Sequence, residues 1–169
     1  VQALLAHGAH VNARSTNDLT PLEYGFLRMS NVHLVAMVPV AKALLNAGAT
    51  VTQQAKEAVL RASQNFEFHR AGFNSDSVEE TSAAAEALCA LCSVEPAARR
   101  RMHDGNSPIV AIARTDAERF AELWDLLVPS SGPCKTLQGE VVRIAGRVRD
   151  EWYRNGGGNW DRNYASMAS

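Results

Sequence analysis

The chain has few cysteines, almost no net charge and no long apolar run, and each of these absences excludes a class of protein. Three cysteines in 169 residues are too few, and too unevenly spaced, for the disulfide framework of a small secreted protein. We therefore expect a reducing, cytoplasmic location. A formal net charge of −1 provides no field that would attract nucleic acid or an anionic membrane. No apolar run reaches the roughly 18 residues of a membrane span. We predict neither nucleic acid nor membrane as a partner.

The first residues also lack a start signal. The chain begins at Val1 rather than at a methionine, without the basic lead and cleavage site of a signal peptide. We therefore expect a fragment, or a chain whose start is missing. What is present is an ordinary globular composition, with 46% hydrophobic and 21% charged residues.

Two stretches, residues 1–11 and 40–51, are near copies of each other. Each carries a leucine pair (Leu4-Leu5 and Leu44-Leu45) followed by a glycine (Gly8 and Gly48). Such a pair supplies an apolar helical face, and the glycine fits a left-handed C-terminal cap. Thr20-Pro21-Leu22 carries an N-cap and a proline at the first helical position. Residues 20–52 thus predict a helix pair, a repeat unit that cannot bury its apolar faces alone.

The Thr-Pro-Leu start and the Leu-Leu…Gly end resemble an ankyrin repeat. The resemblance implies an all-α, ankyrin-like helical repeat stack, an α-solenoid that acts as a protein–protein interaction scaffold rather than as an enzyme. Where the family usually has His after Thr-Pro-Leu, this chain has Glu23. The two copies are 40 residues apart, against about 33 in the family. We place the surplus in residues 26–39, as a loop that exposes Met29 and His33.

A weaker copy is predicted over residues 104–132. Asp104-Gly105-Asn106-Ser107-Pro108 resembles the finger and the Thr-Pro-Leu motif, and Leu126-Leu127 followed by Gly132 resembles the end of the repeat. Thr115 and Glu118 form a capping box before a helix over residues 118–128. Further helices are predicted over residues 53–64 and 78–94. The second of these follows a Ser77–Glu80 capping box, and an aromatic loop over residues 66–76 separates the two.

The last third predicts one long helix over residues 136–155. Spacings of three and four define an apolar stripe that we expect to be buried: Leu137, Val141, Ile144, Val148 and Trp152. Gly139 and Gly146 share another face, which permits close approach of a second helix and makes it a candidate homodimer contact. We predict two domains, a repeat stack over residues 1–132 and a divergent helical C-terminal cap over residues 133–169.

The ankyrin resemblance implies where a partner binds. Contacts would come from the finger, from the adjoining first-helix face and from the weaker copy: Arg14, Ser15, Thr16, Asn17, Asp18, Glu23, Phe26, Asp104 and Asn106. The alternative is a small-molecule-binding or enzymatic domain with an aromatic pocket in the C-terminal half. That pocket would be lined by Phe66, Phe68, Phe73, Trp152, Trp160 and Tyr164.

No motif predicts a catalytic residue, a metal ligand or a cofactor. Cys89 and Cys92 form a CxxC, but they lie inside an alanine-rich helix with no second ligand pair, which favours two buried thiols. The five histidines show no metalloprotease spacing and are interpreted as surface or capping residues. Residues 99–101, three arginines, are too few for a nucleic-acid patch and predict a solvated helix end.

Overall fold

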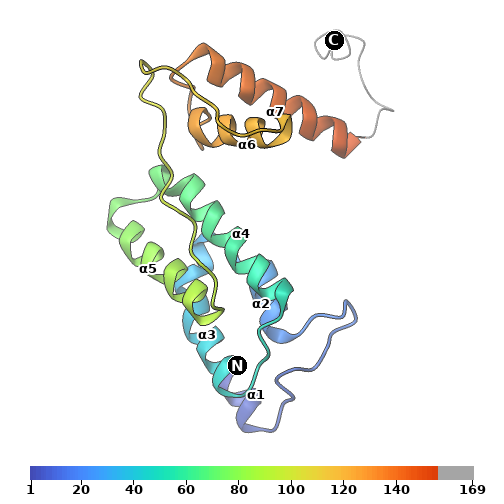
Figure 1. Cartoon of the computed structure of the whole chain (residues 1–169). Coiled ribbons are helices and arrows are strands. Elements are labelled where there is room, and N and C mark those ends of the chain that lie inside the picture. Colours follow the sequence, from blue (N-terminus) through green and yellow to red (C-terminus); the bar gives the residue numbers. More distant parts are fainter. Residues whose placement is uncertain (156–169) are drawn as a thin grey trace. The chain divides into compact units, whose positions relative to one another are not determined.

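Figure 1 shows the computed structural model of the chain, which describes residues 1–155. Within this range every regular element is helical and no strand is present, which confirms the all-α prediction. No helix in these residues is both long and apolar enough to cross a membrane. The chain divides into two compact units, Val1–Arg99 (unit 1) and Arg100–Ser169 (unit 2). Each unit is described by itself below.

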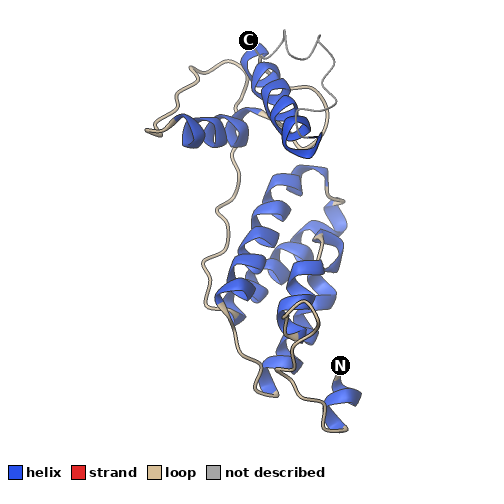
Figure 2. Cartoon of the chain, turned by 90° about the vertical axis from the view of Figure 1, so that its right-hand side faces the viewer, coloured by secondary structure: helices blue, strands red, loops and turns tan. Residues whose placement is uncertain are grey.

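Unit 1 is a set of paired helices. Its helices are α1 (Gln2–Ala6), α2 (Pro21–Arg28), α3 (Leu34–Asn46), α4 (Gln53–His69) and α5 (Ser75–Leu91), with short 3₁₀ turns at Asn31–His33 and Arg70–Gly72. Helix α2 packs against α4, α3 packs against α5, and α4 also contacts α5. The pair α2–α3 thus lies beside the pair α4–α5, as Figures 1 and 2 show.

Hydrogen bonds of threonine side chains fix where the helices of unit 1 begin. The Thr20 hydroxyl accepts from the Glu23 N–H at 3.3 Å, and the Thr20 N–H donates to the Glu23 carboxylate at 2.7 Å. With Pro21 at the first helical position, this is the predicted N-terminus of α2, completed as a capping box. Thr52 caps α4 in the same way, accepting from the Ala55 N–H at 3.2 Å.

Three helices of unit 1 end alike. Gly8 (φ 80°), Gly48 (φ 89°) and Ser93 (φ 53°) follow α1, α3 and α5 in the left-handed region. In each case the next N–H closes the last turn on a carbonyl five residues back, a Schellman-type bond. These bonds run from Ala9 to Leu4 (3.1 Å), from Ala49 to Leu44 (3.0 Å) and from Val94 to Cys89 (2.9 Å). The two glycine stops are confirmed, and a third copy of this ending lies at α5.

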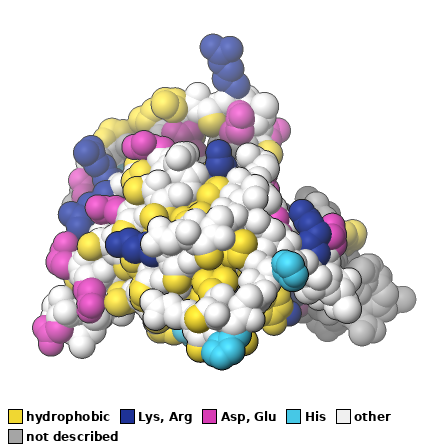
Figure 3. All heavy atoms as spheres, turned by 90° about the horizontal axis from the view of Figure 1, so that it is seen from below, with side chains coloured by type: hydrophobic (Ala, Val, Ile, Leu, Met, Phe, Trp, Pro, Cys, Tyr) yellow, Lys and Arg dark blue, Asp and Glu magenta, His cyan; other side chains and the backbone are white. Residues whose placement is uncertain are grey.

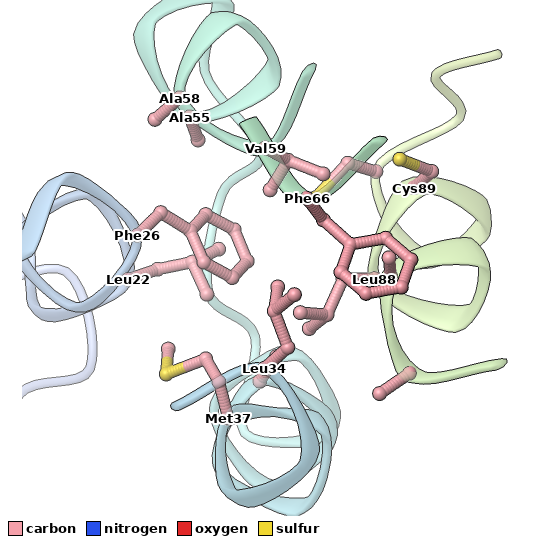
Figure 4. Packing of buried hydrophobic residues seen from close by; sticks show 14 of the residues in the cluster. Leu22, Phe26, Leu34, Met37, Ala55, Ala58, Val59, Phe66, Leu88 and Cys89 are labelled. Atoms are coloured by element: carbon pink, nitrogen blue, oxygen red, sulfur yellow. The ribbon is translucent and has the colours of Figure 1, made fainter. Parts of the chain in front are cut away.

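The core of unit 1 is shared by four helices, as Figure 4 shows. The largest fully buried side chains of unit 1 come from α2, α3, α4 and α5 and pack together in this core. Neither helix pair could therefore bury its apolar face without the other. Phe66 also packs edge-on against Phe73, with ring centroids 5.1 Å apart. The fully buried set includes Leu22, Phe26, Leu34, Val59, Phe66, Leu88 and Cys89.

Two connections in unit 1 differ from the prediction. The long loop expected over residues 26–39 is wrong, because α2 runs to Arg28 and α3 begins at Leu34. Met29 is half-buried against the core instead of exposed, whereas His33 is exposed as expected. The aromatic loop over residues 66–76 is also wrong, because the apolar side of α4 continues through Phe66 and the helix ends at His69.

The start of α5 is the third difference in unit 1. Its N-cap is Asn74, whose side-chain oxygen accepts from the Asp76 N–H at 3.1 Å. The capping box expected at Ser77 is therefore wrong. Ser77 lies within the first turn of α5, because an asparagine three residues earlier already binds a free amide of that turn.

The described part of unit 2, residues 100–155, contains two helices, α6 (Asp116–Leu127) and α7 (Leu137–Asn155), which pack together. The Thr115–Glu118 capping box is confirmed, with both backbone bonds at 3.3 Å. The two-helix copy expected over residues 104–132 is wrong, because residues 108–114 form no helix. The division between compact units falls after Arg99 rather than after residue 132, and α6 and α7 lie in the same unit.

The two faces of α7 have exchanged their predicted roles. A side chain at Gly146 would overlap the Trp124 ring, and one at Gly139 would come within 2.9 Å of the Cys134 Cβ. Both glycines are buried against residues of the same unit, so their face is not open to a second copy. The stripe expected to be buried is instead exposed, at 79% for Leu137, 59% for Val141 and 55% for Ile144. Periodicity defines both faces, but only the small glycines admit the Trp124 ring.

Candidate functional site

The predicted finger is a turn that its own hydrogen bonds close. The Ser15 N–H donates to the Leu19 carbonyl and the Asp18 N–H donates to the Ser15 carbonyl, each at 2.9 Å. The Arg14 guanidinium donates to the Asp18 carbonyl at 2.6 Å and lies 3.3 Å from its carboxylate. All five side chains from Arg14 to Asp18 are exposed. The finger therefore presents polar groups from a backbone that is already ordered.

Asn12 fastens the base of the finger to the neighbouring loop. Its side-chain amide donates to the Gly48 carbonyl at 2.9 Å, and its oxygen accepts from the Thr50 N–H at 2.9 Å. One side chain thus satisfies both kinds of backbone group in the loop after α3. The two loops it joins follow the two copies of the leucine–glycine motif, so corresponding parts of the copies lie side by side.

Glu23 is a structural residue, and its prediction as a partner contact is wrong. It is 2% exposed, and its carboxylate accepts from the Thr52 hydroxyl at 2.6 Å as well as from the Thr20 N–H at 2.7 Å. The bond from Thr52, followed by that from Thr20, lowers the pKa of Glu23 below its ordinary value. Glu23 thereby joins the N-terminus of α2 to that of α4.

Phe26 is likewise not an exposed contact, because it is 2% exposed in the core. It does form part of the floor of a groove of about 230 Å³ between α2, α4 and the turn Asn31–His33. The remaining lining combines apolar side chains with a polar rim: Leu27, Met29, Ser30, Asn31, Ala58, Arg61, Ala62 and Asn65. This groove was not predicted, because it depends on how α2 meets a helix more than 25 residues later.

The exposed side of α2 connects the finger to this groove. Tyr24 and Leu27 are exposed one turn apart, and the Arg28 guanidinium lies over the Tyr24 ring, 5.6 Å from its centroid. The finger precedes α2 and the groove lies at its end, so about 12 Å of helix separates them. We call the finger, this side of α2 and the groove the α2 surface.

Charge of one sign does not dominate the molecule where Figure 3 views it. Hydrophobic side chains lie in the middle of that face, with acidic and basic side chains around them. A mixed face of this kind agrees with the net charge of −1. It differs from the basic stripe that binds a phosphate backbone.

Asp104 and Asn106 lie in unit 2, in a turn of their own. The Asp104 carboxylate accepts from the Ser107 hydroxyl at 2.6 Å and from the N–H groups of Asn106 and Ser107 at 2.8 Å each. These bonds, the hydroxyl bond first, hold the pKa of Asp104 well below its ordinary range. The structure therefore brings the finger, Glu23 and Phe26 together in unit 1 and places these two residues in the other unit.

The residues of the alternative aromatic pocket are also divided. Phe66 and Phe73 pack together in unit 1, and Phe68 packs edge-on against the His69 ring beside it. Trp152 belongs to unit 2, and Trp160 and Tyr164 lie outside the described residues. Phe66 and Phe73 thus belong to the core of unit 1, and among the aromatic side chains of this unit only Phe26 lines the groove.

The CxxC thiols are buried, and no described group resembles a metal centre. Cys89 and Cys92 lie in the core, where burial raises the pKa of both thiols, that of Cys92 to about 11. The Cys89 carbonyl accepts the third Schellman bond, from the Val94 N–H, as the carbonyls of Leu4 and Leu44 accept the first two. Among residues 1–155 no cluster of three metal-binding side chains occurs.

Arg100, the middle residue of the arginine run, and His103 are more buried than predicted, whereas Arg99 and Arg101 are exposed as expected. The Arg100 side chain is 7% exposed and donates to the carbonyls of Trp124, Asp125 and Val128, so it caps the end of α6 instead of being solvated. His103 is 8% exposed, and its ring accepts from the Gly105 N–H at 3.0 Å. Neither role was predicted, because each depends on a backbone group that the fold supplies.

A second cleft of unit 1 is polar. It has a volume of about 330 Å³ beside α4 and α5, and Arg70 is its most buried cation. The Arg70 guanidinium donates to the Glu67 carboxylate at 2.6 Å and to the Ser82 hydroxyl at 2.5 Å. The bonds that Glu67 accepts raise the pKa of Arg70. The bond from Arg70 to Ser82 joins the turn after α4 to α5, so this guanidinium has a structural use.

Comparison of the chain with protein-family models, with curated proteins and with solved structures finds no match.

Proposed function

We propose that the chain is a protein-binding repeat module, in which unit 1 is an ankyrin-like stack that contacts its partner through the α2 surface. The observation that carries this proposal is the groove at the end of α2. Its lining combines the apolar side chains of Phe26, Leu27 and Met29 with the exposed polar side chains of Arg61 and Asn65. Protein interfaces are built in this way, with a small apolar centre inside a polar border.

The stacking of unit 1 supports the ankyrin-like part of the proposal. Corresponding loops are joined by Asn12, and successive helix starts are joined by Glu23. The repeated endings at Gly8, Gly48 and Ser93 mark three successive units. Such stacks bind through an extended surface and need no catalytic group.

The finger supports the binding part of the proposal. Because its backbone is already hydrogen-bonded, a partner would meet ordered Arg14 and Asn17 side chains without ordering a loop. Arginine and tyrosine are also the residues that most often carry interface energy, and Arg61 and Tyr24 lie on the same surface.

The proposal is tested by quantitative capture of proteins from extracts of the source cell on the immobilised chain. An Arg61→Glu variant changes the groove rim, an Arg14→Ala/Asn17→Ala variant changes the finger, and Gln64→Glu is the matched control on α4 outside the groove. We expect at least one protein whose recovery falls about tenfold with the first two variants and stays unchanged with the control. Equal recovery with all three variants would contradict the α2 surface.

A further inference from the structure

Unit 2 leaves apolar surface uncovered on α7. Among its described residues only Leu127 and Val128 are buried hydrophobic side chains, whereas Leu137, Val141 and Ile144 are each more than half exposed. A helix pair with so small a core gains stability chiefly by burying more apolar surface. The three residues lie on the side of α7 opposite Gly139 and Gly146, so α6 does not reach them.

The uncovered residues form a narrow seam and not a broad face. They continue into Val148, which is half-buried, and positions 137, 141, 144 and 148 alternate spacings of four and three, which is the repeat of a coiled-coil contact. Glu140 and Arg147 lie along one edge of this seam, and Gln138 and Ala145 lie along the other. The second edge is uncharged and includes a small residue, so a second helix can approach closely there.

The charges at the edge select the direction of that second helix. The Glu140 carboxylate already accepts from the Cys134 N–H and from the Arg143 guanidinium of its own chain, at 2.8 Å each, and so is held at a fixed place on this edge. If two copies of α7 pair antiparallel, with Leu137 opposite Val148 and Val141 opposite Ile144, Glu140 of each copy lies across from Arg147 of the other. The symmetry of the pair produces this opposite-charge contact twice. A parallel pair would instead place Glu140 across from Ala145, with no charge complement. The seam is therefore complementary to itself in the antiparallel direction.

We propose that α7 binds α7 of a second copy of the chain in an antiparallel pair, through the seam of Leu137, Val141, Ile144 and Val148. This contact uses the face opposite the glycines, and it is independent of the α2 surface. It makes the protein a dimer that presents two copies of unit 1.

The experiment is sedimentation equilibrium of the full chain up to about 200 µM, which detects dimers far weaker than typical stable ones. We expect a dimer. Ile144→Glu should give a monomer, because it places a charge in the centre of the seam on both copies. Arg147→Glu should raise the dimer Kd about tenfold, because Glu140 then faces a like charge at two places. Arg154→Glu, the same charge change beyond the paired span, should leave the dimer Kd unchanged.

Three results would overturn the proposal. The first is a monomeric wild-type chain at the highest concentration. The second is a dimer that Ile144→Glu leaves intact, which would place the contact elsewhere. The third is a monomer whose α7 amides near Val141 and Ile144 exchange as slowly as buried ones, with side-chain labelling equally slow, which would mean that another part of the chain covers the seam. Ile144 is 55% exposed, so its variant should fold, and unchanged far-UV circular dichroism should show this.

Discussion

Units 1 and 2 are both helical, but they are stabilised in different ways. Unit 1 has a core to which four helices contribute, with Phe26, Phe66 and Leu88 almost fully buried. Unit 2 buries few hydrophobic side chains in its described part and relies on charged groups bound to its backbone. Arg100 donates to three carbonyls at the end of α6, and the Glu122 carboxylate accepts from the N–H groups of residues 112 and 113.

Because of this difference, we expect the two units to respond differently to amino-acid substitutions. Burial of apolar area has no preferred direction, so the core of unit 1 should tolerate small changes in how its side chains meet. Charge-assisted bonds need correct geometry, so each one in unit 2 is hard to replace. The two units can also be followed separately, because all three tryptophans (Trp124, Trp152 and Trp160) belong to unit 2.

The largest effect is expected from Phe26→Ala in unit 1. Removing a buried ring should lower the free energy of unfolding of unit 1 by about 4 kcal/mol, through lost burial and the cavity left behind. In urea, the circular dichroism transition of unit 1 should move to a lower concentration while the tryptophan fluorescence transition stays in place. If both transitions moved together, the units would unfold as one body and the comparison above would fail.

Arg100→Ala should have the opposite pattern: it should destabilise unit 2 and leave unit 1 unchanged. It leaves the last carbonyls of α6 without their donor and Asp125 without its partner at 2.9 Å. We expect a loss of about 3 kcal/mol from unit 2, because three backbone carbonyls lose the charged donor that they share. The tryptophan fluorescence transition should shift, with that of unit 1 unchanged. Arg101→Ala, which removes an exposed neighbour, is the control and should shift neither.

Glu23→Gln tests how much the negative charge of Glu23 contributes to the stability of unit 1. In the described part of that unit, Glu23 is the only carboxylate that joins two helix starts. We expect a loss of about 2 kcal/mol at pH 7, because charged hydrogen bonds from Thr52 and Thr20 become neutral ones. The folded-state pKa of Glu23 is lowered, so its contribution is complete above the unfolded-state pKa of about 4.3 and is lost as the pH falls through the folded-state value.

The pH dependence supplies the check on this assignment. The stability difference between wild type and Glu23→Gln, from urea unfolding followed by circular dichroism, should be largest at pH 7 and should narrow towards pH 3. A difference that is equal at both pH values would show that the residue acts through packing and not through its charge.

Local signals in the sequence predicted local structure well. Thr20 with Pro21, Thr115 with Glu118, and the glycines at positions 8 and 48 each specify a helix end within a few residues, and all are confirmed, whereas Gly132 lies beyond the end of α6, which Val128 caps. The finger was also predicted as a polar turn. These signals succeed because a cap depends on side chains and amides that are neighbours in the chain.

Contacts between distant segments were not predictable in the same way. Whether Glu23 and Phe26 face a partner or the core depends on Thr52 and α4, which the sequence near them does not contain. The face that α7 turns towards α6 depends on the fit of Trp124 against Gly146. The groove at Arg61 and Asn65 arises only once α2 and α4 lie together.

The smallest predicted effect tests the helix ending at Ser93. The sequence did not predict this ending, because a serine stands where the other two endings have a glycine. Ser93 has φ 53°, a conformation that costs a side chain of its type more than it costs glycine, and it occupies the position that Gly8 and Gly48 hold after their helices. Ser93→Gly should therefore stabilise unit 1 by about 0.5–1 kcal/mol in urea unfolding. The reverse exchange, Gly48→Ser, should destabilise unit 1 by a similar amount, because nothing crowds that glycine and only its backbone conformation is at stake. Opposite shifts of similar size would identify α1, α3 and α5 as ends of one repeated unit, and a loss of stability in both variants would instead show that the Ser93 side chain has a role of its own.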